Sequence, residues 1–189
     1  MDVLDAIYHR RSVRHYSDAT VTRGVVRDLL LAAVQAPSAQ NLQPWAFAIF
    51  HGRDRLKAYS TRAKAHLLAT QEPSFGLDPN IDRYDNQKVN VFHDADTLIV
   101  IFATPGRFTP VEDCLLAGEN LMLAAHGMGL GSCPIGFARS WFNLPEIKAE
   151  CKIPANYIAV LPIVVGYPAA AAPAVPREEA EIACWHWDE

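Results

Sequence analysis

The sequence predicts a single domain of the α+β class, and three observations support this prediction. The chain has 189 residues, of which 50% are apolar, so it can bury one sizeable core without metal or disulfide staples. Segments with helical periodicity alternate with short apolar runs that are typical of strands. These runs are few, and short helices do not join them in a regular series, which argues against a doubly wound parallel sheet. We therefore expect residues 1–189 to form one domain.

Two helices are predicted near the start of the chain. Asp2 is placed to cap the first, and Thr22 is placed to cap the second, which extends to Gln35. Pro37 ends that helix, because the residue before a proline is pushed out of helical geometry. Apolar residues recur at helical spacing again in residues 56–67, which predicts a third helix.

A fourth predicted helix starts at Pro110. Thr109 and Glu112 complete a capping box around this proline. Residues 115–125 are apolar nearly all round, so the helix is either buried on every side or shared with another subunit. Gly118 would allow a neighbouring element to approach this helix closely.

Strands are predicted where short apolar runs occur, at residues 45–50, 97–103, 132–135 and 157–165. Pro162 places the last of these strands at a sheet edge or at a β-bulge, because proline cannot donate a ladder hydrogen bond. Residues 71–90 are polar and interrupted by proline and glycine. This longest irregular stretch is the natural place for a segment that covers a site.

Composition argues against several classes of protein. The formal net charge of −4 gives no general reason to expect nucleic acid or an anionic membrane as a partner. No apolar run approaches the ~20 residues that span a bilayer, and the N-terminus lacks an apolar stretch of signal-peptide length. The four cysteines lie far apart, without metal-binding spacing. We expect a reduced, cytoplasmic protein with no metal site and no nucleic-acid or membrane partner.

Three glycines at positions 127, 129 and 131 do not form a dinucleotide-binding fingerprint. They follow a helix and precede a strand, which is the reverse of the order that the fingerprint requires. The segment 133–136 instead places proline and glycine beside a strand end, where exposed backbone NH groups can serve a ligand.

A basic cluster follows the first predicted helix. Three arginines, Arg10, Arg11 and Arg14, lie within five residues together with Ser12. Guanidinium groups offer paired hydrogen bonds to oxyanions such as phosphate. By itself, the cluster fits a solvated basic turn at a helix C-terminus even better.

A polar loop lies between the second helix and the first strand. Ser38, Gln40, Asn41 and Gln43 place hydroxyl and amide groups within residues 36–45. Amides both donate and accept hydrogen bonds, so they suit a polar heterocycle. An ordinary turn, with its side chains bonded to its own backbone, is the simpler alternative.

Four segments together resemble the nitroreductase superfamily of FMN-dependent oxidoreductases. They are RRSVRHY at 10–16, PSAQNLQPW at 37–45, AGENLMLAAHGMGLGSCPIG at 117–136 and GYP at 166–168. The resemblance implies a three-layer α+β fold with a mixed central sheet flanked by helices. It also implies an intertwined homodimer with two FMN sites, in which residues 168–189 form a connector and a C-terminal arm that is exchanged with the partner.

The resemblance also implies which residues hold the cofactor. Arg10, Arg11 and Ser12 would bind the phosphate and ribityl end of FMN, joined by Arg177. Arg14 would lie by the pyrimidine edge of the isoalloxazine ring and stabilise the reduced flavin by its charge.

Two further segments would contact the flavin. The loop contributed by the partner subunit corresponds to Pro37, Ser38, Gln40 and Asn41. The segment that packs on the flavin face corresponds to Pro134, Ile135 and Gly136, and one of its backbone NH groups would point toward N5.

The implied activity is hydride transfer from NAD(P)H through flavin N5 to a small-molecule acceptor, such as a nitroaromatic compound or a quinone, in a ping-pong cycle. No acid or base side chain is required, because the cofactor carries the chemistry. Residues 71–95 would form a substrate-side lid. Phe75, Tyr84 and Phe92 are candidate wall residues there, although core packing suits each equally well.

Two alternatives stay open at this point. The same fold could serve other flavin chemistry, namely flavin fragmentation, dehalogenation or ring oxidation. The chain could also bind flavin without turnover.

Overall fold

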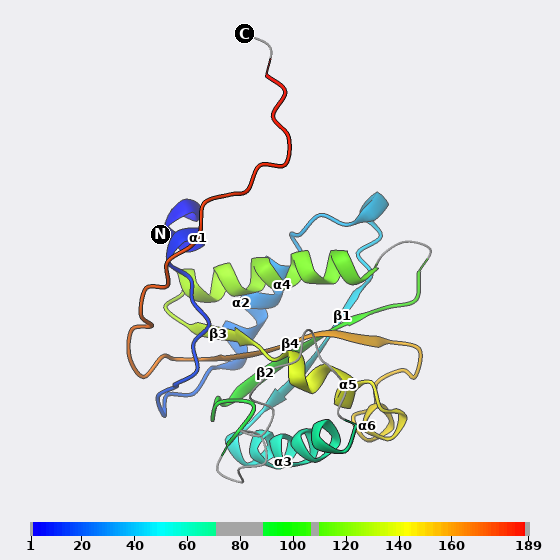
Figure 1. The fold of residues 1–189 in the computed structure, drawn as a ribbon. Coiled ribbons are helices and arrows are strands. Elements are labelled where there is room, and N and C mark those ends of the chain that lie inside the picture. The colour runs from blue at the N-terminus through cyan, green and yellow to red at the C-terminus, as the bar shows by residue number, and fades with distance from the viewer. Residues whose placement is uncertain (1, 71–88, 107–109, 188–189) are drawn as a thin grey trace.

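The computed structural model describes residues 2–70, 89–106 and 110–187 (Figure 1). Its strands are β1 (Trp45–His51), β2 (Thr97–Ala103), β3 (Gly131–Pro134) and β4 (Ile158–Gly166). Its larger helices are α1 (Val3–His9), α2 (Arg23–Ala33), α3 (Arg53–Thr70) and α4 (Pro110–Gly127). The shorter ones are η1 (Ala39–Asn41), η3 (Gly136–Ala138), α5 (Arg139–Phe142) and α6 (Pro145–Glu150).

The four strands form one sheet in the order β1-β2-β4-β3. Helices α2 and α4 cover one face of the sheet, and α3, α5 and α6 lie on the other (Figure 1). This arrangement confirms the predicted α+β class and its three layers. The sheet of the described residues is antiparallel and not mixed as the resemblance implied, because all three strand pairs are antiparallel. The parallel pairing in this part of the chain is an isolated bridge between Ser12 and Ser132.

Two apolar clusters hold the layers together. Alternate residues of β2 point to opposite faces, so Ile99 and Ile101 join the cluster under α2 and α4, whereas Leu98 and Val100 join the cluster against α3 and α5. Every residue of β2 is buried. A continuous apolar run is therefore the pattern expected of this central strand.

The predicted elements match the observed ones closely at most boundaries. Thr22 caps α2 by accepting a hydrogen bond from the amide of Val25 at 3.3 Å. Asp2 occupies the N-cap position of α1, but its side chain makes no capping hydrogen bond. Helix α2 ends at Ala33, earlier than Gln35. Thr109 lies outside the described residues.

Of the two positions predicted for Pro162, the edge is wrong, and the bulge occurs in the same strand but at Val160, two residues before the proline. Strand β4 lies between β2 and β3, in the interior of the sheet. The β2–β4 register shifts between Ile101 and Phe102, which pair with Leu161 and Ala159. On the other side of β4, the β3 ladder ends at the pair Pro134–Ile163. The Pro162 carbonyl accepts from the Ile135 amide, so the proline nitrogen also faces the β3 side, where the ladder has ended. An interior strand tolerates this proline because no ladder hydrogen bond is lost there.

Residues 169–187 contain no helix or strand and are exposed along their whole length. In Figure 1 this segment, drawn in orange to red, leaves the body of the domain after passing beside α1. It carries Ile182, Trp185 and Trp187, whose exposures are 56%, 65% and 75%. None of the helices in the described part of the chain has the length and hydropathy needed to cross a membrane.

Candidate functional site

The basic cluster lies on an extended segment that runs beside two elements of the sheet. After α1, the amide of Val13 donates to the carbonyl of Ser132 on β3 at 3.0 Å. Farther along, the amide of Ser17 donates to the carbonyl of Tyr167 at 2.8 Å, directly after β4. We call residues 10–15 the arginine segment. The sheet fixes its position although no regular helix or strand contains it.

The arginine segment and the start of the C-terminal arm together enclose a hollow. Its volume is about 480 Å³. It is lined by Arg11, Ser12, Arg14 and His15 on one side and by Ala170, Pro173, Val175 and Arg177 on the other. We call it the arginine hollow. The fold therefore brings Arg177 to the same place as Arg11 and Ser12, two of the residues predicted to bind phosphate.

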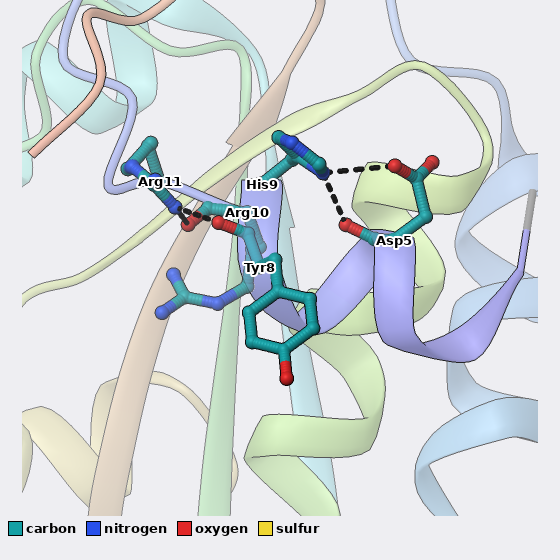
Figure 2. A network of polar contacts seen from close by, with 5 residues as sticks. All are labelled: Asp5, Tyr8, His9, Arg10 and Arg11. Carbon is teal, nitrogen blue, oxygen red and sulfur yellow. Dashed lines mark hydrogen bonds and ion pairs between the residues drawn. The ribbon is translucent and has the colours of Figure 1, made fainter. Parts of the chain in front are cut away.

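Arg11 carries a buried donor that has no partner. One terminal nitrogen of its guanidinium donates to the carbonyls of Tyr8 and Arg10, each at 2.7 Å (Figure 2). Its Nε atom is buried, and so is the hydroxyl of Ser132, and neither forms a hydrogen bond within the described residues. Buried polar atoms are normally satisfied, so these two indicate a ligand. Arg11 lines the arginine hollow and also a neighbouring hollow that Ser132 lines, and a phosphate group suits guanidinium donors.

Arg10 lies in a neighbouring hollow of about 310 Å³, which it shares with Arg11, His126 and Ser132. Its Nε atom is 3.5 Å from a carboxylate oxygen of Glu119 on α4. The preceding turn of α1 is closed by His9, whose Nδ1 lies 2.8 Å from the Asp5 carboxylate (Figure 2). The structure thus separates Arg10 in part from the hollow that holds Arg11, Ser12 and Arg14.

Arg14 is exposed, and its charge acts on buried groups around it. Burial raises the pKa of the Cys133 thiol, and the positive charge of Arg14 and a hydrogen bond with Ser12 oppose that rise. Burial also raises the pKa of Tyr16, whose hydroxyl donates to the Val13 carbonyl at 2.7 Å. Arg14 therefore supplies a positive charge close to Cys133 and Tyr16.

His93 is a neighbour of Arg14 that the sequence analysis missed. Its pKa is lowered to about 4, first by burial and then by the charges of Arg14 and His15. His93 and Asp94 both have positive φ, of 55° and 57°. No motif surrounds His93 in the sequence, so only its position after the polar segment could have drawn attention to it.

The polar loop lies at the other end of α4. Gln40 lines a third hollow with Pro110 and Asp113 of the first turn of α4, whereas His126 at the other end of the helix lines the hollow that contains Arg10. Because α4 has 18 residues, these ends are about 27 Å apart. Within one chain, Gln40 and Asn41 do not reach the arginine hollow.

The loop is held in an unusual backbone conformation. Gln40, Asn41 and Gln43 have φ angles of 52°, 56° and 49°, a region that costs L-residues other than glycine about 1–2 kcal/mol each. The hydroxyl of Ser38 accepts a hydrogen bond from the Gln43 amide at 3.0 Å. Pro37 precedes this turn and is exposed. Gln40 and Asn41 are also exposed, so their side chains are available to a ligand.

In the segment after β3, the backbone amide of Ile135 already donates a hydrogen bond within the protein. The Ile135 amide donates to the Pro162 carbonyl at 2.8 Å, and the Ile135 side chain is buried. Gly136 is exposed, and a Cβ atom built on it would meet open space. Pro134 is half-buried at the end of the strand. The backbone beside Gly136 is therefore open to the approach of a flat ligand.

The three candidate wall residues have different outcomes. Phe75 and Tyr84 lie outside the described residues, as does most of the predicted lid. Phe92 is 0% exposed and packs in the apolar cluster on the α3 side of the sheet. Phe92 is therefore a core residue and does not line a site in this structure. Among the described residues, no group of three or more His, Cys, Asp or Glu side chains could hold a metal ion.

Comparisons with known proteins show the family of this chain. The model of the Nitroreductase family matches residues 7–167. A relative from Archaeoglobus fulgidus, with the provisional name NADH dehydrogenase/NAD(P)H nitroreductase, is 30% identical over 173 residues, which are 88% of this chain and 86% of the relative. A 4-nitrobenzoate reductase from Nocardioides is 29% identical over 203 residues, covering 88% of this chain and 81% of that enzyme. A nitroreductase from Bacteroides fragilis, solved with bound FMN, has a TM-score of 0.80 at 24% identity and covers 100% of both chains.

Proposed function

Because the chain belongs to the Nitroreductase family, we propose that it is an FMN-dependent oxidoreductase. It takes reducing equivalents from NAD(P)H and passes them to a small acceptor, such as a nitroaromatic compound or a quinone, in a ping-pong cycle. The names of the Archaeoglobus and Nocardioides relatives support this reductant and this class of acceptor. The four cysteines are free, which suits a reducing cytoplasm as its location.

The observation that carries the proposal is the arginine hollow with the unpartnered Nε atom of Arg11. Arg11, Ser12 and Arg177 bind the phosphate through charge-assisted hydrogen bonds, and Arg10 adds a positive charge from the neighbouring hollow. This grouping favours a phosphate site over a solvated basic turn, because a solvated turn would leave no buried donor without a partner.

Arg14 would place its positive charge at the pyrimidine edge of the flavin. When bound, FMN supplies hydride transfer at its N5 atom. Arg14 stabilises the negative charge of the reduced form by electrostatic preorganisation. The Ile135 amide is engaged by Pro162, so the amide of Gly136 is the group that we assign to N5.

We propose that the site is completed by a second copy of the chain. The arginine segment and the polar loop lie at opposite ends of α4, so one chain cannot place both on one cofactor. Helix α4 exposes Leu115 and Leu116, and α1 exposes Leu4, each by about half of its surface. An apolar face of this kind marks a protein interface. In a homodimer, Ser38, Gln40 and Asn41 of one protomer meet the cofactor of the other.

The C-terminal arm supplies a second contact in this homodimer. Strand β1 is an edge strand, and beside it lies a hollow of about 1040 Å³ that includes Arg23, Arg27, Ile49 and His51. The arm carries exposed apolar residues and the acidic residues of the segment 178–181. Its charge and apolar side chains complement this edge, and we propose that the partner's arm covers it.

Rapid mixing tests the activity. The purified yellow protein is mixed with NADH or NADPH without oxygen, and the absorbance of oxidised flavin is followed. We expect the absorbance to be lost and then restored by a nitroaromatic acceptor. A bound flavin that stays oxidised with both nucleotides would overturn the reductase proposal. A colourless protein that does not bind added FMN would overturn the cofactor itself.

A further inference from the structure

A buried carboxylate ties the turn of the polar loop to α4. The amide of Ala39 donates to both carboxylate oxygens of Asp113, at 3.3 and 3.2 Å. Asp113 is 7% exposed and lies in the first turn of α4, where the helix dipole favours a negative charge. No ion pair of the described residues includes Asp113. Its carboxylate is therefore directed at the loop and not at a cation.

This tether holds the part of the loop whose backbone is strained. The hydrogen bonds of the Asn41 amide with the Ser38 carbonyl and of the Leu42 amide with the Ala39 carbonyl lie within the turn and define its shape. At the end of the loop, the Pro44 carbonyl accepts from the Thr104 amide at 2.9 Å and from the Cys114 thiol at 3.7 Å, which fixes Pro44 and not the turn before it. The Ala39–Asp113 contact joins the turn to a helix that packs on the sheet. It lies directly before Gln40 and Asn41, the first two residues with positive φ.

We propose that Asp113 is a positioning residue for the cofactor site: through the Ala39 amide it fixes the polar loop in the orientation in which Gln40 and Asn41 reach the cofactor of the partner protomer. The proposal rests on the proposed function for the identity of the ligand. The tether itself does not depend on it.

Two variants and one control test the proposal. Asp113→Ala removes both acceptor oxygens, and Asp113→Asn keeps one of them at nearly the same size. Glu112→Ala is the matched control, because Glu112 lies in the same first turn and is exposed. Amide hydrogen exchange of Ala39 reports the tether whether or not flavin is bound. We expect exchange to become at least ten times faster in Asp113→Ala, less so in Asp113→Asn, and to be unchanged in Glu112→Ala.

FMN titration and the visible circular dichroism of the bound flavin report the orientation of the loop. We expect the dissociation constant of FMN to rise about 10-fold or more in Asp113→Ala, with a changed dichroism band, and to recover in part in Asp113→Asn. A general loss of folding would instead lower the cooperativity of unfolding, which is measured on the same samples. Asp113→Asn keeps the test decisive if Asp113→Ala fails to fold.

The outcomes separate this proposal from the proposed function. Unchanged exchange at Ala39 in both Asp113 variants would overturn the tether. Faster exchange with unchanged FMN affinity and dichroism would overturn its role in positioning. If the wild-type chain bound no FMN, the proposed function would fail, and the exchange measurement alone would still decide whether Asp113 holds the loop.

Discussion

Ser12 and Ser132 form a parallel β-bridge between two segments that lie far apart in the chain. This bridge aligns the arginine segment with β3 and brings it beside the start of the C-terminal arm. The contact is close because the neighbouring residue Gly131 has no side chain. A Cβ atom at Gly131 would lie 2.7 Å from the Cβ of Val13. The position of the residues that we propose to bind phosphate therefore depends on a glycine in the sheet.

The substitution Gly131→Ala tests this dependence. The added methyl group would push Val13 and the arginine segment away from β3, at a cost of about 1–3 kcal/mol for overpacking. We expect a lower melting temperature and weaker FMN binding, measured by thermal unfolding and by titration. Gly127→Ala is the matched control, since a Cβ atom there meets nothing within 4 Å. Equal behaviour of the two variants would contradict the close contact.

Removal of single arginines tests the phosphate site. Arg11→Ala or Arg177→Ala should each remove charge-assisted hydrogen bonds worth about 1.5–3 kcal/mol, which corresponds to roughly 10- to 100-fold weaker FMN binding. Arg10→Ala also weakens retention of FMN. Equilibrium titration of the apoprotein measures the effect. Lys57→Ala is the control, because the Lys57 side chain is exposed on α3, and this variant should bind FMN like the wild type. Unaltered affinity in both Arg11→Ala and Arg177→Ala would place the phosphate elsewhere.

The charge of Arg14 should set the reduction potential of the flavin. Without it, the negative reduced form loses a stabilising interaction, so we expect the potential of Arg14→Gln to be more negative. Because Arg14 is exposed, the effect is on the order of 20–30 mV, or about 1 kcal/mol for two electrons. Equilibration with a dye of known potential measures it. An unchanged potential would show that Arg14 lies away from the ring.

His93 should make stability depend on pH under acidic conditions. Its folded-state pKa of about 4 lies below the usual value of about 6.5, so the fold favours the neutral imidazole. The contribution of His93 to the free energy of unfolding is present above pH ~6.5 and is lost as the pH falls toward ~4. Arg14 and His15 oppose protonation, and Asp94 favours it.

The variant His93→Asn isolates this effect, because asparagine tolerates the positive φ of this position. Between neutral pH and pH ~4, we expect the wild type to lose about 1–2 kcal/mol more unfolding free energy than the variant, a figure reduced for solvent screening. Urea unfolding at the two pH values measures the difference. Parallel losses in the two proteins would show that His93 is not the responsible group.

The C-terminal arm should strengthen the homodimer. Deletion of residues 178–189 removes the exposed tryptophans but keeps Arg177. We expect a folded protein whose homodimer has a higher dissociation constant, measured by sedimentation velocity. The double substitution of Trp185 and Trp187 by alanine should have the same effect. His186→Ala, between them, is the control. A dimer of unchanged affinity after deletion would show that the arm does not take part.

Local signals along the chain account for most of the elements. The hydroxyl of Thr22, the apolar run of β2 and the prolines at 37 and 110 act on neighbouring residues, so their effects can be predicted from sequence. The prediction that Pro162 lies at a sheet edge was wrong, because the order of strands is decided by pairing between distant segments. The composition of one strand does not specify its neighbours.

The candidate site divides in the same way. The residue types of the arginine segment and the polar loop, and their resemblance to a flavin-binding family, are properties of the sequence. The resemblance also implied that Arg177 joins Arg11 and Ser12, and the structure places the three in one hollow. Only the tertiary structure decided that Arg10 lies partly apart from them, that Asp113 holds Ala39, and that Phe92 lies in the core. These relationships join residues that are far apart along the chain. They arise because burial of two apolar clusters fixes the sheet and its helices, and the loops then lie where the ends of these elements place them.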